Sequence, residues 1–103
     1  MTTVRFTDRK LADLPSVDVV GQQLFTLVDD QRRRNLLLNF AAVEYLSSAA
    51  LLKLMTLRKK LLAAGGKLVL CGVTPQIYEV FAVTKLDKLF LMRADEQEGL
   101  QAF

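Results

Sequence analysis

Residues 35–51 read N-L-L-L-N-F-A-A-V-E-Y-L-S-S-A-A-L, and this stretch decides the fold. Its first part, residues 36–40, is an apolar run broken only by Asn39. Such a run is typical of a strand covered on both faces, as in a sheet with parallel pairs. A short loop over residues 41–46 then leads to a helical pattern that begins at Ser47 and ends at Ala64. The stretch therefore predicts a buried strand that leads through a loop into the N-terminus of a helix.

Strands and helices alternate on both sides of this stretch. The expected strands cover residues 4–6, 36–40, 67–71 and 89–92, and the expected helices cover residues 16–30, 47–64, 74–81 and 95–103. The Gly65-Gly66 pair is a C-terminal signal for the longest helix. Regular alternation of this kind favours α/β layering with crossover helices. We therefore predict a compact α/β fold with a small mixed β-sheet and about four α-helices, and one domain over residues 1–103.

Composition excludes several kinds of active site. The 103 residues include one cysteine and no histidine, which removes Ser-His and Cys-His pairs, His-based metal sites and thiolate zinc sites. The sequence contains no nucleotide-binding motif and no paired carboxylates of catalytic type, so we predict a protein that is not an enzyme and has no cofactor or metal. No apolar run is long enough to span a bilayer, and a single cysteine is typical of a reducing setting, which predicts a cytoplasmic location.

The net charge of +3 is modest. Its two densest basic runs are Arg32 to Arg34 and Arg58 to Lys60. Both lie where a helix is expected to end, and cations there complement the helix dipole. Nucleic-acid binding favours a broader basic stripe with aromatic residues between the charges. We therefore predict no direct nucleic-acid partner.

The serine pair at the start of the long helix has two interpretations. Ser47 is the natural N-cap, whose hydroxyl accepts from a backbone N–H of the first turn, and most serines at such positions are caps and nothing more. The functional interpretation uses the free N–H groups and partial positive charge of a helix N-terminus, which accommodate a phosphate. Phosphorylation there would add about −1.5 to −2 charge to a small neutral surface and would repel a partner with acidic or apolar groups.

Four stretches, in order and spacing, resemble the STAS domain of anti-sigma factor antagonists: L-L-L-N-F, L-S-S-A-A-L, A-A-G-G-K-L-V-L-C-G-V and I-Y-E-V-F-A-V-T-K-L-D-K-L-F. The resemblance covers the chain from Val4 onward. It implies a bacterial transcription regulator that binds an anti-sigma factor or a related serine kinase. In that family the kinase phosphorylates the first serine of the serine pair, and a serine phosphatase removes the phosphate. The first serine corresponds to Ser47 here, and the second corresponds to Ser48.

The sequence departs from the family pattern in three places. Leu46 stands where the family has aspartate, and Ala49 stands where it has glycine. The first change removes a polar group beside the serine, and the second places a methyl group where a partner would approach the backbone. The family also has an additional N-terminal strand. Only one strand is expected before the first helix here, so a sheet edge is left open, where a second copy could pair.

The expected partner-binding and modification residues surround the serine pair. Five apolar residues of the long helix are expected to face the core: Ala50, Leu51, Leu54, Leu57 and Leu61. Lys53, Thr56 and Lys60 fall on the opposite side and are expected to be solvated. Ser47 and Ser48 are the candidate phosphorylation sites. The candidate partner-binding residues are Leu46, Ser47, Ser48, Ala49, Leu52, Met55 and Lys59.

Part of this assignment stays open. Leu52 and Met55 lean toward the side shared with Ser48 and Lys59. They form either a docking patch or an ordinary core margin with one exposed leucine. Arg58 either extends to the rim of the core or pairs with a phosphate or a partner carboxylate.

Three classes of function remain in order of preference. The first is a partner switch controlled at Ser47. The second is a non-switching STAS scaffold or a subunit of a signalling or transport complex, which Leu46 and Ala49 favour. The third is an enzyme, against which the absence of histidine and of catalytic motifs counts.

Overall fold

The structure, a computed structural model, describes residues 2–6, 9–11, 14–32 and 34–103, and the side chains of all of these except 11 and 14–16. Its elements are β1 (Thr2–Arg5), β2 (Lys10–Leu11), α1 (Leu14–Asp29), β3 (Asn35–Asn39), β4 (Tyr45–Leu46), α2 (Ser48–Ala63), β5 (Lys67–Cys71), α3 (Pro75–Val83), the 3₁₀ helix η1 (Leu86–Lys88), β6 (Leu91–Arg93) and α4 (Glu96–Gln101). Among these residues no helix has the length and apolar character needed to cross a bilayer.

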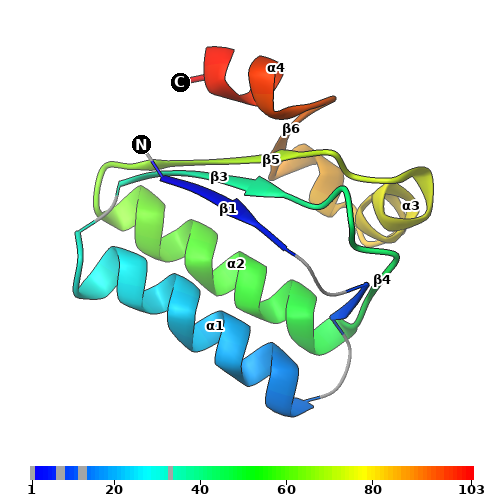
Figure 1. Cartoon of the computed structure of the whole chain (residues 1–103), viewed down its shortest axis with the longest axis horizontal. Helices are drawn as coiled ribbons and strands as arrows, with labels where there is room; N and C mark the ends of the chain where they lie inside the picture. The colour runs from blue at the N-terminus through cyan, green and yellow to red at the C-terminus, as the bar shows by residue number, and fades with distance from the viewer. Residues whose placement is uncertain (1, 7–8, 12–13, 33) are drawn as a thin grey trace.

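The main sheet has the strand order β1-β3-β5-β6. Helices α1 and α2 run side by side along one face, and α4 lies on the other (Figure 1). This confirms the α/β fold class with four α-helices. One detail differs: the described strand pairs are all parallel rather than mixed. Between consecutive strands of this sheet, a connection returns the chain to the end of the sheet where the previous strand began. Such crossovers produce parallel strand pairs.

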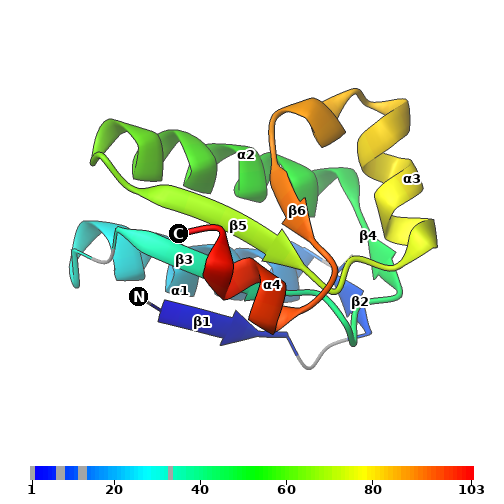
Figure 2. The same ribbon diagram turned by 90° about the horizontal axis from the view of Figure 1, so that it is seen from above.

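Both faces of the sheet are covered by helices, which explains the leucine run in the middle of β3. Leu36, Leu37 and Leu38 are all fully buried. Leu36 and Leu38 belong to the large core beneath α1 and α2, and Leu37 packs with Val69 and Cys71 on the α4 side. Seen from above, α4 crosses β3 and β5 (Figure 2). The expectation of a strand buried on both faces is confirmed.

Two short strands were not expected from the sequence. β2 lies in the segment expected to be a connection, and β4 lies in the loop that precedes the serine pair. They form a separate two-stranded sheet in which Lys10 pairs with Tyr45 and Leu11 pairs with Leu46. Two strands therefore precede α1, not one. β1 is still an edge of the main sheet within the described part of the chain, because β2 pairs elsewhere.

Glu96 holds the start of α4 against the sheet. Arg5 donates to its two carboxylate oxygens through Nε at 2.7 Å and through a terminal nitrogen at 2.8 Å, and Asn39 Nδ2 donates at 2.6 Å. The hydrogen bond from Arg5 and then that from Asn39 lower the pKa of Glu96. Both favour the ionised carboxylate because their donors bind the charged form.

We expect the docking of α4 to weaken in acid. A carboxyl group whose folded pKa is depressed stabilises the fold above its unfolded pKa, here 4.5, and loses that contribution as the pH falls through the folded pKa. The substitution Glu96→Gln should therefore flatten the decline of the unfolding free energy below about pH 4.5 in urea titrations. Glu79→Gln, an exposed carboxylate on α3, is the control. An unchanged acid decline in Glu96→Gln would contradict the expectation.

Candidate functional site

Ser47 joins β4 to α2 and is the N-cap of the helix. Its backbone is extended, with φ −81° and ψ 166°, and its Oγ accepts from the N–H of Ala50 at 3.2 Å. Upstream, the N–H groups of Glu44 and Tyr45 donate to the carbonyl of Arg9 at 2.7 and 3.0 Å. The serine is therefore held from both sides, by the small β2–β4 sheet before it and by the first turn of α2 after it. The predicted cap is confirmed.

The serine pair lies at the surface. Ser48 is exposed and Ser47 is half-buried. Ala49 is half-buried and packs against the core. Leu46 differs from the expectation of a partner contact, since its side chain is only 5% exposed and belongs to the core. In the short strand β4 the alternation of side chains directs Leu46 inward, so this residue anchors the serines and offers little surface to a partner.

The candidate docking residues of α2 share one side of the helix. Ser48, Leu52, Met55 and Lys59 recur at intervals of three and four residues, which places them in one row. Leu52 is 63% exposed, Met55 is half-buried and Lys59 is exposed. The structure thus brings these residues together beside the serine pair. The expected core positions of this helix are confirmed: Ala50, Leu51, Leu54, Leu57 and Leu61 are buried.

Two lysines expected to be solvated face a neighbouring helix instead. Lys53 and Lys60 are half-buried and form ion pairs with Asp18 and Asp29 of α1, at 3.5 and 2.9 Å. Their ammonium groups also lie 5.8 and 5.3 Å from the centre of the Phe25 ring. The expectation was wrong because α1 packs along this side of α2. Thr56, expected on the same side, is exposed as predicted.

Arg58 reaches across to the segment that follows η1. Its Nε donates to the carbonyl of Leu89 at 2.9 Å. In this structure its guanidinium therefore satisfies a backbone acceptor. This contact ties the middle of α2 to η1 and fixes the border of the candidate surface.

Sequence reasoning missed three exposed apolar side chains near this surface. Tyr45, two residues before Ser47, is 54% exposed, Leu62 is 53% exposed, and Leu89 is 44% exposed. Leu62 continues the row of Ser48, so an extension of the same periodicity would have found it. Tyr45 follows from the alternation of β4, which was not predicted. No local signal relates Leu89 to α2, because the two meet only through the tertiary fold.

The start of α2 suits a negative charge. Its first turn contains no acidic residue, so the partial positive charge of the helix N-terminus is not offset there by a carboxylate of that turn. In the described part of the chain, no three Cys, Asp or Glu side chains group closely enough to hold a metal ion. The start of α2 thus presents a hydroxyl pair at the surface, next to a helix N-terminus.

Removal of the cap should have a measurable but limited cost. We expect Ser47→Ala to lower the unfolding free energy by about 1 kcal/mol, because the N–H of Ala50 loses its acceptor. Ser48→Ala removes an exposed hydroxyl and should change it by less than about 0.5 kcal/mol. Chemical denaturation of the two variants in parallel measures both values. Equal effects of the two substitutions would contradict the capping role.

The fold is that of a small α/β domain with a serine pair at the start of α2. The model of the STAS domain family matches residues 10–99. A curated relative is BtrV of Bordetella bronchiseptica, named as a candidate anti-sigma factor antagonist, which is 30% identical over 74 residues. That alignment covers 72% of this chain and 64% of BtrV, so the chain spans less than two thirds of this relative. The chain belongs to the STAS domain family.

Solved structures agree with this fold. A candidate anti-sigma factor antagonist from Thermotoga maritima has a TM-score of 0.86 at 17% identity, over 97% of this chain and 86% of that one. The phosphorylated Bacillus cell fate determinant SpoIIAA has a TM-score of 0.75 at 19% identity, over 98% and 89%. A sulfate transporter family protein of Wolinella succinogenes also has a TM-score of 0.75, at 12% identity over 97% and 83%. The TM-scores establish a shared fold, and identities this low show the fold alone.

Proposed function

We propose that this protein is a cytoplasmic regulatory binding protein rather than an enzyme. Its single domain, residues 1–103, binds an anti-sigma factor or a related serine kinase and so releases the client of that partner. Phosphorylation of Ser47 prevents binding, and a serine phosphatase restores it. The observation that carries the proposal is the serine pair at the start of α2, adjacent to the row of exposed Leu52, half-buried Met55 and exposed Lys59.

The chemistry requires little from the protein itself. The Ser47 Oγ attacks the γ-phosphorus of ATP bound to the kinase and passes its proton to a catalytic base of the kinase, while the bond to the β–γ bridging oxygen breaks and ADP leaves. The phosphate then adds about −1.5 to −2 charge at the N-terminus of α2. Backbone N–H groups of the first turn favour that charge, so the helix remains folded. A partner whose facing groups are acidic or apolar is repelled without a change in the shape of the domain.

The comparisons support this proposal at the level of relatives. BtrV is named as a candidate anti-sigma factor antagonist, and SpoIIAA is itself known in unphosphorylated and phosphorylated forms. The order of elements around the serines in this chain is compatible with the same use. The position of Ser47 at a helix N-cap supports the proposal, because a phosphate there would lie at the N-terminus of α2.

Incubation with ATP and a candidate kinase tests the proposal directly. Intact mass should show one added phosphate in the unmodified protein and in Ser48→Ala, and none in Ser47→Ala. Kinase binding should be lost in the phosphorylated protein and regained after phosphatase treatment. A kinase that binds the protein stably but never transfers phosphate to Ser47 would contradict the switch.

A non-switching role is the second candidate. Leu46 and Ala49 favour it, because a buried leucine and a methyl group stand where the family has an aspartate and a glycine. The fold likeness to a sulfate transporter family protein is compatible with a subunit of a transport complex. Stable binding to a partner that is unaffected by Ser47→Asp would favour this function over the first.

A further inference from the structure

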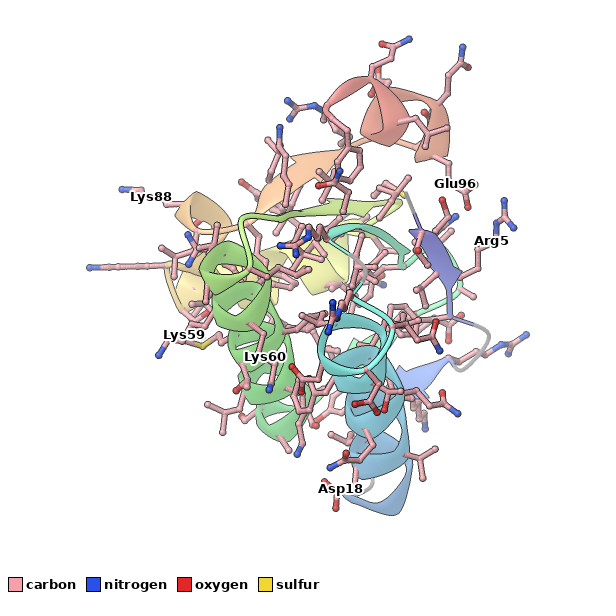
Figure 3. The ribbon with its side chains drawn as sticks, turned by 90° about the vertical axis from the view of Figure 1, so that its left-hand side faces the viewer. Arg5, Asp18, Lys59, Lys60, Lys88 and Glu96 are labelled. Atoms are coloured by element: carbon pink, nitrogen blue, oxygen red, sulfur yellow. The ribbon has the colours of Figure 1, made fainter. Side chains whose placement is uncertain are left out.

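Cations and exposed apolar side chains alternate on the outer side of α2 and on the adjacent segment around η1. We call this surface the α2–η1 face; it consists of Leu52, Met55, Lys59, Leu62, Lys85, Lys88 and Leu89. Six of these seven residues are exposed, and Met55 is half-buried. Lys59 and Lys88 extend on the same side of the molecule (Figure 3). The face continues the row that begins at Ser48.

The two parts of this face are fixed relative to one another. Arg58 of α2 donates to the carbonyl of Leu89, which joins the two parts directly. The segment after η1 is held in turn by α3, where the ring of Phe81 packs edge-on against Phe90 with 5.5 Å between ring centres. The acidic residue inside η1, Asp87, is half-buried, with its Oδ2 3.5 Å from the hydroxyl of Tyr78. The exposed side chains of η1 and of its flanking residues are therefore basic or apolar.

Lys85 occupies a backbone conformation that disfavours lysine. Its φ is 63° and its ψ is 17°, in the left-handed region where glycine is favoured. The side chain is exposed, so it makes no core contacts that could offset this strain. Lys85 directly follows the C-cap of α3, a position where a left-handed residue commonly ends a helix, and its charge is presented to solvent.

We infer that the partner presents an acidic amphipathic segment to the α2–η1 face, with carboxylates opposite Lys59, Lys85 and Lys88 and apolar side chains opposite the leucines. This rests on the proposed partner-binding function and specifies the chemistry of the partner. An acidic segment suits this face because its carboxylates would complement the charge of the lysines. A second copy of the chain is a poor occupant, because two identical basic faces repel one another.

Such a partner also explains how a phosphate at the far end of α2 can act. The helix has 16 residues and is therefore about 24 Å long. An acidic segment along it is attracted by the cations of η1 and repelled by a phosphate on Ser47. The lysines thus attract the carboxylates of the partner, and a phosphate on Ser47 repels the same carboxylates.

Two synthetic helical peptides of about 20 residues provide the probe. Both carry leucine at positions i, i+3, i+4 and i+7; one carries glutamate at the remaining positions and the other carries lysine. In NMR titrations of the full chain, the glutamate peptide should shift the amide signals of α2 and η1. Its association should weaken strongly in about 1 M salt, where the Debye length is about 3 Å. The lysine peptide should not bind.

Paired variants separate charge from folding. Lys85→Gly removes a cation and relieves the left-handed strain. It should therefore raise Tm by about 4 °C and weaken binding of the glutamate peptide about threefold. Lys59→Gln with Lys88→Gln should weaken it about tenfold. Arg32→Gly is the matched control: Arg32 also has a positive φ of 55°, but it lies in the segment after α1, which ends at Asp29, and not beside η1 in the sequence. It should raise Tm without weakening the peptide.

The outcomes distinguish this inference from the proposed function. Equal binding of the two peptides, or equal weakening by Arg32→Gly and Lys85→Gly, would overturn the acidic partner. So would sedimentation with phosphatidylserine vesicles together with no binding of the glutamate peptide, which would assign the face to a membrane. If the kinase phosphorylates Ser47 but the glutamate peptide does not bind, only this inference fails. If the peptide binds and no kinase modifies Ser47, only the switch fails.

Discussion

The substitution Ser47→Asp is expected to weaken binding to the kinase partner about a hundredfold, or about 3 kcal/mol, with no loss of folding. Aspartate is as good an N-cap as serine and interacts favourably with the helix dipole, so the N–H of Ala50 keeps an acceptor. The new carboxylate nevertheless introduces a charge on a surface whose first helical turn has no acidic residue. The same position therefore separates stability from recognition.

Isothermal titration against the partner and thermal melting together measure this result. Ser48→Asp is the matched control, because it places the same charge one residue further on at an exposed position without altering the cap. It should weaken binding less than Ser47→Asp does. Tm should fall in neither variant. A Ser47→Asp protein that melts normally and binds as the unmodified protein does would contradict the switch.

The second large effect is expected for Gly66→Ala, which should lower the unfolding free energy by about 3 kcal/mol. A Cβ on Gly66 would overlap the backbone carbonyl of Arg34, a group that cannot rotate away. That carbonyl accepts from the N–H of Lys67 at 2.8 Å, at the first residue of β5. Relief of the overlap therefore requires β3 and β5 to separate where their pairing begins.

Gly65→Ala is the control for this substitution. Gly65 has a φ of +78°, but nothing lies within 4 Å of the position its Cβ would take. Its cost is backbone strain alone, about 1 kcal/mol. Urea denaturation of the two neighbouring variants should therefore separate steric overlap from conformational strain. Equal destabilisation by both would contradict the close approach of Gly66 to Arg34.

The buried positions of the fold were predictable because they follow the local periodicity of the sequence. The five buried positions of α2 follow from a helical repeat, and the leucines of β3 follow from an unbroken apolar run. The strands β2 and β4 were not predictable. Each has two residues, which is too short for a sequence pattern to identify it as a strand, and they exist only because the fold brings Lys10 beside Tyr45.

The candidate site was predictable to a similar degree. The Ser47 cap and the row from Ser48 to Lys59 follow from position on one helix. Contacts between helices were not predictable, because helical periodicity states which side a residue faces but not which element covers it. The sequence therefore predicted Lys60 to be solvated, whereas it pairs with Asp29, and it contained no signal for the contact of Arg58 with Leu89.

The β2–β4 pair has a consequence for any enzyme that modifies Ser47. The backbone on the N-terminal side of the serine is tethered to residues 9–11, and the hydroxyl is already engaged by the helix that follows. The substrate is thus a rigid corner, not an extended strand that a kinase could draw into a groove. We expect recognition to depend on the assembled tertiary surface, so that a short linear copy of this corner would be a poor substitute.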